Sequence, residues 1–413
     1  MIGPRPEPRE FWRELSVGLG FVGLTLVGTQ FVLTARLKAI SNLFSMDEVY
    51  HYHLRASVVG FVLVLAHPLI LFVFNPTAVR LLNPFTAPAR YTFGVMAVSA
   101  MIVLLVTSVY RRQLDIKYEI WRSLHTIFAV VMVVAAMLHI LGVDHYLSSL
   151  WQRGLWTVLV VVWLGLIVNS RLLKPVRQLA SPFKVAEVRR EVDYVWTVVI
   201  KPEGHEGIRF MPGQFAWLTI GRSPFAIREH PFSIASSAEK PDHLAFTIRE
   251  AGDFTSRISG VPVGSVVYID GPHGDFSIDV HDGPGYVFMA GGIGSPPIMS
   301  MIRTLADRGS HKPIWLFYGN VTHESITYRK ELEALQHALD LRVIHVLETS
   351  PEDWTGESGF ISPAILDRHL PGNRHELIYF ICGPVPMIGA MLDALEQINV
   401  PSVNAHTELY DMV

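Results

Sequence analysis

Two stretches of the chain, HLRASVVGFVLVLAH at residues 53–67 and HTIFAVVMVVAAMLH at residues 125–139, each begin and end on a histidine. Between these histidines the side chains are almost all apolar, and both stretches lie in segments long enough to cross a bilayer. Fourteen residues of α-helix rise roughly 21 Å and complete nearly four turns, so both histidines of a stretch point to nearly the same side. The shared spacing predicts two membrane helices, each with one histidine near each end.

Five segments of the chain have the length and apolar composition of transmembrane helices. The loops after the first, third and fifth segments carry most of the nearby arginine and lysine, and the positive-inside rule assigns such loops to the cytoplasm. We therefore expect a multi-pass protein of the cell inner (plasma) membrane, with its amino terminus outside and its C-terminal half in the cytoplasm. The segments cover approximately residues 15–35, 53–74, 91–110, 122–142 and 154–170.

The two histidine-bearing segments are separated by one crossing, so they run through the membrane in the same direction. This sets His53 opposite His125 at the cytoplasmic end and His67 opposite His139 near the outer end. Neutral imidazole is a good axial ligand of haem iron, and a histidine inside hydrocarbon needs a functional reason. The sequence predicts two bis-histidine haem sites stacked across the membrane. The alternative, histidines that only hydrogen-bond between helices, leaves the equal spacings unexplained.

Arg122, one turn before His125, is a candidate partner for a haem propionate, or else an arginine that snorkels to the membrane edge.

Composition separates the chain into an apolar part and an ordinary soluble part. The 413 residues are enough for two or three domains, and 50% of them are hydrophobic whereas 17% are charged. The long uncharged runs lie before residue 170, and residues 181–413 read as a soluble α/β sequence. A net charge of −3 gives no indication of nucleic acid as a partner. The single cysteine, Cys382, excludes an intramolecular disulfide and an all-cysteine iron–sulfur site.

The first part of the soluble half predicts an antiparallel β-barrel. Lys174-Pro175 and Ser181-Pro182 are expected to break the last membrane helix and to form a short linker. Short strand-like segments with Gly and Pro turns then continue to about residue 280. Two motifs lie among them: His230-Pro231-Phe232-Ser233, and Gly252-Asp253-Phe254-Thr255 at an expected helix start, where free backbone N–H groups can hold a diphosphate.

From about residue 285 the pattern changes to strand, glycine turn and helix, which is typical of an α/β nucleotide-binding domain. The turn is Gly291-Gly292-Ile293-Gly294-Ser295-Pro296, whose glycines let the backbone approach a pyrophosphate at a helix N-terminus. A final strand at residues 377–381 ends in Cys382-Gly383-Pro384, at the edge where such sheets bind ligands. Cys382 is therefore a candidate site residue, or alternatively a buried, inert thiol.

Taken in order, these motifs resemble the ferredoxin–NADP reductase superfamily over roughly residues 181–413. The resemblance implies that His230-Pro231-Phe232-Ser233 contacts a flavin, with His230 standing where soluble members usually carry arginine. It also implies that Gly252 to Thr255 forms the FAD diphosphate loop and that Gly291 to Pro296 forms the nicotinamide-cofactor loop.

Two catalytic candidates follow from the same resemblance. Cys382-Gly383-Pro384 is similar to the family motif near the nicotinamide ring. Tyr410, in the tail Glu408-Leu409-Tyr410, would stack on the isoalloxazine of the flavin; an exposed terminal aromatic is the alternative.

With the haem spans included, the whole chain resembles the bacterial NADPH oxidase and ferric reductase family. The resemblance implies a helical transmembrane haem domain at residues 1–175, an FAD-binding β-barrel at 181–280 and a Rossmann-like NAD(P)H-binding α/β domain at 285–413. Members commonly have six spans, whereas five are expected here, the missing one being at the amino terminus. The implied cofactors are FAD, two b-type haems and NAD(P)H, with NADPH favoured by the resemblance alone. The arginine frequent in NADPH users is absent after Asn320, so Arg329 or Tyr328 is the remaining candidate for a 2′-phosphate, unless both only cap a surface helix.

These parts imply electron transfer from NAD(P)H through FAD and haem to an acceptor outside. Oxygen, reduced to superoxide, is favoured because no long exterior loop is expected that could hold a metal chelate. A ferric or cupric chelate is the first alternative acceptor. A relay that feeds a periplasmic or membrane partner protein is the second.

Overall fold

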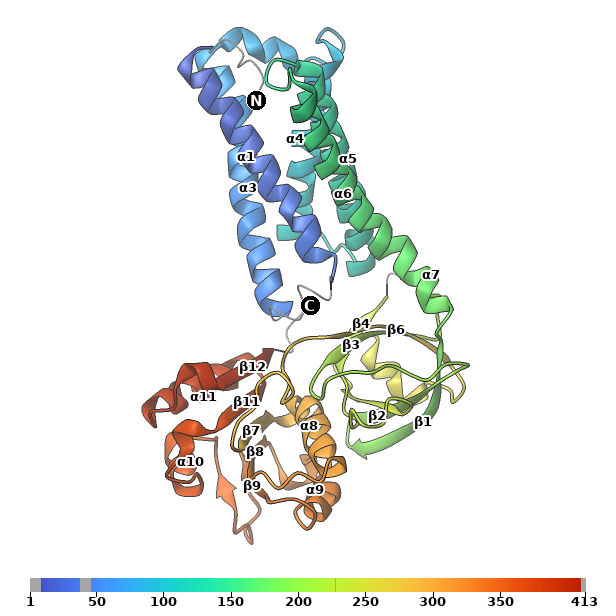
Figure 1. Cartoon of the computed structure of the whole chain (residues 1–413), viewed down its shortest axis with the longest axis vertical. Helices are drawn as coiled ribbons and strands as arrows, with labels where there is room; N and C mark the ends of the chain where they lie inside the picture. The colour runs from blue at the N-terminus through green and yellow to red at the C-terminus, as the bar shows by residue number, and fades with distance from the viewer. Residues whose placement is uncertain (1–8, 38–45, 227, 410–413) are drawn as a thin grey trace. The chain divides into compact units, whose positions relative to one another are not determined.

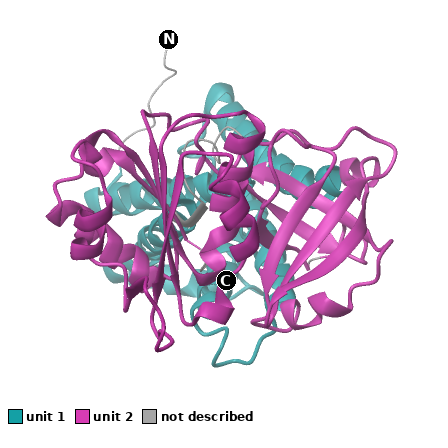
Figure 2. Ribbon diagram, turned by 90° about the horizontal axis from the view of Figure 1, so that it is seen from below, with its two compact units in different colours: residues 1–37, 48–175 teal, residues 38–47, 176–413 magenta. Residues whose placement is uncertain are grey.

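The computed structural model of the protein describes residues 9–37, 46–226 and 228–409. These residues form two compact units (Figure 2). The first unit is helical, and the second is built on two β-sheets. The units comprise residues 1–37 with 48–175, and residues 38–47 with 176–413.

The first unit is a bundle of long apolar helices (Figure 1). Among the described residues, five helices are long and apolar enough to cross a membrane, which confirms the five spans expected from the sequence. A 3-10 helix, η1 (Pro76–Leu82), lies between the second and third of them. The five are α1 (Phe11–Thr34), α3 (Met46–Phe74), α4 (Ala89–Val109), α5 (Tyr118–Val143) and α6 (Leu150–Val168).

The last span does not end where the sequence suggested. A π-helical turn, η2 (Asn169–Leu173), carries α6 directly into α7 (Lys174–Leu179), so the prediction that Lys174-Pro175 breaks the helix was wrong. A proline cannot donate the usual helical hydrogen bond, but a π turn changes the bonding pattern just before it and lets the chain continue.

Small residues set the close approach of the membrane helices. A Cβ added to Gly28 of α1 would lie 2.0 Å from the Trp163 ring of α6, and one added to Gly23 would lie 3.0 Å from the carbonyl oxygen of Gly60 in α3. Membrane helices pack through such small residues and expose apolar side chains to lipid, as Val62 and Val158 are exposed here.

The first sheet of the second unit is antiparallel, with strand order β4-β3-β6-β1-β2-β5. Ile234, directly after β4, pairs with Phe246 of β5, so the two edges meet and the sheet curls around an apolar core. The expected β-barrel is confirmed as this curled antiparallel sheet. Its strands are β1 (Phe183–Val192), β2 (Val195–Pro202), β3 (Phe215–Ile220), β4 (His230–Ser233), β5 (Leu244–Arg249) and β6 (Val266–His273).

The second sheet is parallel, with strand order β10-β9-β8-β7-β11-β12. Its strands are β7 (Tyr286–Gly291), β8 (Ile314–Asn320), β9 (Leu341–Leu347), β10 (Glu357–Ser358), β11 (Ile378–Gly383) and β12 (Ala405–Leu409). Every residue of β7 is buried, as expected of a strand covered on both faces.

Helices cover the parallel sheet on both faces. One apolar core includes α8 (Ser295–Asp307) and α9 (Arg329–Leu335), and the other includes α10 (Pro363–His369) and α11 (Val385–Gln397). The strand order reverses between β7 and β11, and ligands bind doubly wound sheets at the carboxyl ends of strands at such a switch point. The expected α/β domain is confirmed, and its switch point locates the candidate nucleotide site.

Candidate cofactor sites

The outer histidine pair faces across the helical bundle. The imidazole rings of His67 on α3 and His139 on α5 have centroids 6.3 Å apart and planes tilted by 58°. A metal–imidazole bond is about 2 Å long and a ring atom lies roughly 1.2 Å from its centroid, so two imidazoles on opposite sides of one metal have centroids roughly 6.4 Å apart. The spacing of the two rings therefore fits a shared metal, and two histidines would be enough protein ligands to hold a haem iron.

Each outer imidazole is held from a neighbouring helix at Nδ1. His67 Nδ1 lies 2.9 Å from the hydroxyl oxygen of Ser16 in α1, and His139 Nδ1 lies 2.7 Å from the main-chain oxygen of Arg90 in α4. Gly94 lets α4 approach this closely, because a Cβ there would lie 2.9 Å from His139 Nδ1. With Nδ1 engaged, Nε2 is the nitrogen of each ring that remains for a ligand.

The inner histidines are held in the same way by the same two helices. His53 Nδ1 lies 3.1 Å from Oε1 of Gln30 in α1, and His125 Nδ1 lies 3.3 Å from the hydroxyl of Ser108 in α4. The structure thus brings the outer histidine pair together and holds each inner histidine from a neighbouring helix, and a metal shared by His53 and His125 stays a prediction. Arg122 lies on α5 three residues before His125, and its contact with a propionate stays a prediction.

Sequence reasoning missed the residues that hold these imidazoles. Ser16 is fully buried and Gln30 is 5% exposed, although both are polar residues in an apolar span. Their separation, fourteen residues, equals that of the histidines, and α1 runs opposite to α3, so each residue meets one histidine. This spacing was a readable signal, but its meaning depended on which helix lies beside which.

The two motifs expected to bind the flavin come together in the curled sheet. His230-Pro231-Phe232-Ser233 forms β4 and pairs with β3. The His230 ring stacks on Phe254 of the Gly252–Thr255 loop at 4.0 Å, with 17° between the planes. The expected helix start is a short 3-10 helix, η3 (Thr255–Gly260). The Thr255 hydroxyl accepts hydrogen bonds from the N–H groups of Ala251 and Gly252, at 2.9 and 3.0 Å, so these two donors are already used within the loop.

The two motifs expected to bind the nicotinamide cofactor meet at the switch point of the parallel sheet. A Cβ on Gly294 would lie 2.1 Å from the main-chain oxygen of Cys382, and one on Gly291 would lie 3.0 Å from Cδ of Pro384. The short helix η4 (Gly292–Gly294) begins and ends at a glycine, and the buried Ser295 and Pro296 begin α8. Gly383 ends β11 against Gly291. The backbone contact at Gly294 requires glycine there.

Cys382 lies inside β11 rather than after it and is fully buried. Its Sγ is 3.4 Å from the main-chain oxygen of Glu408, the residue that pairs with it on β12. This burial agrees with both interpretations of Cys382, a thiol beside the nicotinamide and an inert core thiol. Tyr410, the other catalytic candidate, lies outside the described residues.

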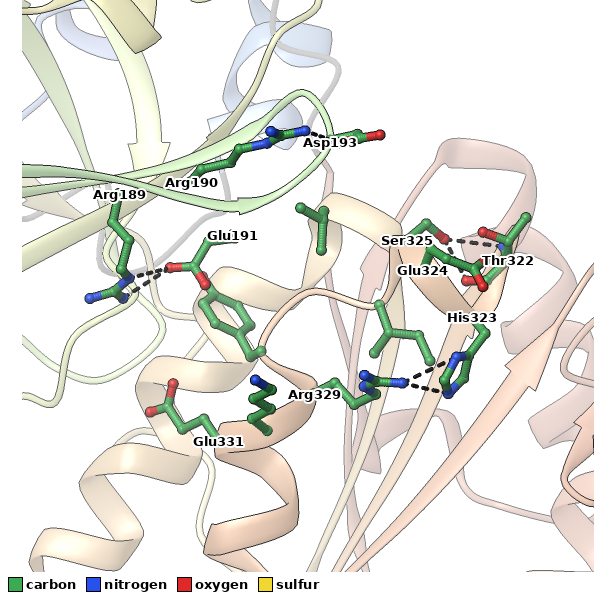
Figure 3. Close-up of a pocket in the computed structure, with 14 residues that line it drawn as sticks. Arg189, Arg190, Glu191, Asp193, Thr322, His323, Glu324, Ser325, Arg329 and Glu331 are labelled. Carbon is green, nitrogen blue, oxygen red and sulfur yellow. Dashed lines mark hydrogen bonds and ion pairs between the residues drawn. The ribbon is translucent and has the colours of Figure 1, made fainter.

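A pocket separates the β1–β2 hairpin from the segment that follows β8 (Figure 3). Arg329 and His323 face each other on its wall, with an Arg329 Nη1 to His323 Nε2 distance of 2.7 Å. Tyr328 is 5% exposed, and its ring lies under the Arg303 guanidinium at 5.0 Å. Tyr328 is therefore a core residue, which leaves Arg329 as the candidate of the two for a cofactor phosphate.

The fold and the sites define a class: a helical membrane domain joined to a flavin-type barrel and a nucleotide-type α/β domain. Comparison with known proteins makes the assignment specific. Residues 19–136 match the ferric reductase like transmembrane component, residues 181–277 match an FAD-binding domain, and residues 288–393 match the oxidoreductase NAD-binding domain. In this order they form the NADPH oxidase/ferric reductase architecture.

Part of the chain is also similar to curated reductases. NADH-cytochrome b5 reductase 1 of Candida albicans is 32% identical over 183 residues, which are 43% of this chain and 62% of that protein. The enzyme of the same name from Mortierella alpina is 29% identical over 186 residues, 44% of this chain and 62% of that protein. The chain thus spans about three fifths of the length of these relatives.

Solved structures share the fold at low identity. The flavohaemoglobin-like FAD/NAD-binding domain of nitric oxide dioxygenase from Vibrio cholerae aligns with a TM-score of 0.50 and 20% identity, over 55% of this chain and 98% of that one. Flavohaemoglobin from Malassezia yamatoensis aligns with a TM-score of 0.51 and 16% identity, over 97% of this chain and 96% of that one. These likenesses concern the fold alone.

Proposed function

We propose that the protein carries electrons across the membrane, from a cytoplasmic nicotinamide through FAD and two b-type haems to oxygen, which leaves as superoxide. One observation carries the proposal: two pairs of histidines, inside apolar helices, each have Nδ1 engaged by a neighbouring helix. The excess of arginine and lysine in alternate loops supports a cytoplasmic dehydrogenase half.

The residues of the soluble half would bind and orient the donor. The glycine turn after β7 offers backbone close to a pyrophosphate, at the N-terminus of α8. Cys382, on the neighbouring strand β11, would lie near the nicotinamide ring, and β4 with the Gly252–Thr255 loop would contact the flavin. The flavin takes two electrons together as hydride and gives them up singly. When bound, haem would supply a one-electron carrier at each histidine pair.

We further propose NADH as the preferred donor. The curated relatives carry NADH in their names. The position after Asn320, where NADPH users often have arginine, is an exposed valine, Val321. Arg329 is already engaged with His323, which reduces its capacity to bind a 2′-phosphate. NADPH, which family resemblance favoured, is thus the alternative donor.

Oxygen is the proposed acceptor because the outer side offers little protein surface for anything larger. Within the described residues, the loops expected to face outward are residues 75–88 and 144–149. A protein acceptor is the second candidate, since the relatives are named for reduction of a haem protein, cytochrome b5. A ferric or cupric chelate would use the same internal route.

Turnover of the full-length protein in nanodiscs separates these acceptors. We expect NADH to drive oxygen uptake with a superoxide signal that superoxide dismutase abolishes. His67→Ala and His139→Ala should each abolish this signal and leave reduction of the flavin by NADH intact. If the protein reduces a ferric chelate under anaerobic conditions and produces no superoxide in air, the choice of oxygen as acceptor is contradicted. Absence of b-type haem from the purified protein would contradict the whole proposal.

A further inference from the structure

We propose that Ser16, Gln30, Ser108 and the Arg90 carbonyl are positioning groups that fix one tautomer in all four ligand imidazoles and lower the reduction potential of the haem at each pair. The inference rests on the proposed function, because it concerns the haems that these histidines would bind. It assigns a role to α1 and α4, two of the helices that carry no ligand themselves.

In the outer pair, the hydrogen bonds determine which ring nitrogen carries the proton. The main-chain oxygen of Arg90 can only accept, so the proton between it and His139 must be on His139 Nδ1. The Ser16 hydroxyl donates its own proton to the main-chain oxygen of His67, at 2.9 Å, and is left to accept from His67 Nδ1. Both rings therefore carry Nδ1–H and a bare Nε2, which is the form that binds a metal.

The inner pair gives the same result through different groups. The Gln30 side-chain amide donates from Nε2 to the Leu26 carbonyl, at 2.9 Å, which turns its Oε1 towards His53 Nδ1 as an acceptor. The Ser108 hydroxyl donates to the Leu104 carbonyl, at 2.7 Å, and accepts from His125 Nδ1. Four independent contacts thus agree on one tautomer.

Hydrogen bonding at Nδ1–H does more than orient the ring. It raises the basicity of the ligating nitrogen, so the iron becomes richer in electrons and harder to reduce. The contacts of the outer pair, 2.9 and 2.7 Å, are shorter than those of the inner pair, 3.1 and 3.3 Å. Loss of Ser16 should therefore change its haem more than loss of Ser108 changes the other.

Redox titration of the full-length protein in nanodiscs, followed by haem absorbance, tests the proposal without turnover. We expect Ser16→Ala to raise the midpoint potential of one haem and Ser108→Ala to raise that of the other by a smaller shift. Ser108→Thr keeps the hydroxyl at an exposed position and should restore the wild-type value. Thr25→Val and Thr107→Val are matched controls, since these hydroxyls bond only to carbonyls of their own helices.

The outcomes separate the two proposals. Unchanged potentials in Ser16→Ala and Ser108→Ala, with both haems still bound, would overturn the positioning role and leave the proposed function standing. An equal shift in Thr107→Val would overturn it too. Wild-type protein without haem would instead refute the proposed function, and this inference with it. If Ser16→Ala loses one haem and the control variants keep both, the result supports the positioning role, since removal of such a partner lowers metal affinity about 10- to 100-fold.

Discussion

Replacement of Gly94 by alanine should remove the outer haem without harm to the helix that carries the change. A Cβ at residue 94 would lie 2.9 Å from His139 Nδ1 and 3.1 Å from its Cε1, whereas ordinary van der Waals contact begins near 3.4 Å. The imidazole must therefore retreat by about half an ångström, which lengthens its 2.7 Å contact with the Arg90 carbonyl and displaces Nε2.

The expected loss of haem affinity follows from the contribution that such hydrogen bonds make to metal binding. Loss of an outer-shell partner lowers metal affinity about 10- to 100-fold, or roughly 1.4 to 2.7 kcal/mol. Alanine by itself favours a helix over glycine by about 1 kcal/mol, so a weakened helix cannot explain a lost haem. The expected result is a protein with one haem in place of two.

Haem and flavin per protein, measured by absorbance, check this expectation. Gly165→Ala is the matched control, because a Cβ there meets nothing within 4 Å. We expect this control to keep both haems, and both variants to reduce the flavin with NADH at the wild-type rate. Gly94→Ala protein with two haems and an unchanged spectrum would refute the argument.

Three further changes probe the soluble half. Gly294→Ala places a Cβ 2.1 Å from the Cys382 carbonyl oxygen, so we expect a loss of about 1–3 kcal/mol in unfolding free energy and weaker NADH binding, whereas Gly389→Ala, with open space around it, should change neither. Cys382→Ser should slow flavin reduction by NADH about tenfold, roughly 1.4 kcal/mol in the barrier, at unchanged flavin content; stopped-flow rates equal to wild type would favour an inert thiol. Burial, together with the stacked His281 ring 3.5 Å away, lowers the pKa of His406 from 6.5 to about 4. As the pH falls below 6.5, His406 binds a proton in the unfolded chain before it does so in the folded protein, so protonation favours unfolding. The stability that neutral His406 contributes is therefore fully present above pH 6.5 and is lost as the pH falls towards 4. His406→Phe keeps an aromatic ring but cannot titrate, so its melting temperature should fall less between pH 7 and 5; an equal fall would contradict this origin.

Features set by local sequence were predictable. The five spans follow from apolar length, and the facing of His67 with His139 follows from helix periodicity plus the direction of the loops' charges. The glycine turn and Cys382-Gly383-Pro384 were expected at one edge of a parallel sheet, and they do meet there. In each case the prediction needed only the pattern within each segment and a general rule for where such segments lie in a membrane bundle or a parallel sheet.

Features that depend on the detailed hydrogen bonding and packing of a segment were not predictable. Pro175 was expected to end a helix, but a π turn five residues long accommodates it. The Gly252–Thr255 segment was expected at a helix start with free backbone N–H groups, but the Thr255 hydroxyl accepts hydrogen bonds from the N–H groups of Ala251 and Gly252. Tyr328 reads as a surface residue beside Arg329, yet it is buried at a backbone φ of 63° under another arginine. The first two outcomes depend on local hydrogen-bond geometry, and the burial of Tyr328 depends on its packing against Arg303 of α8.

The first helix shows how far a repeated spacing constrains a membrane site. Because α1 and α3 run in opposite directions, Ser16 meets His67 and Gln30 meets His53 only if both pairs share one separation along their helices. One residue inserted between Ser16 and Gln30 would rotate half of α1 by about 100° and leave at least one imidazole without its partner. The histidine spacing alone would place two irons; the matching spacing on α1 would fix the nitrogen that binds each of them. The register between these two helices, more than the identity of any one residue, is therefore what the proposed electron route requires of the membrane domain.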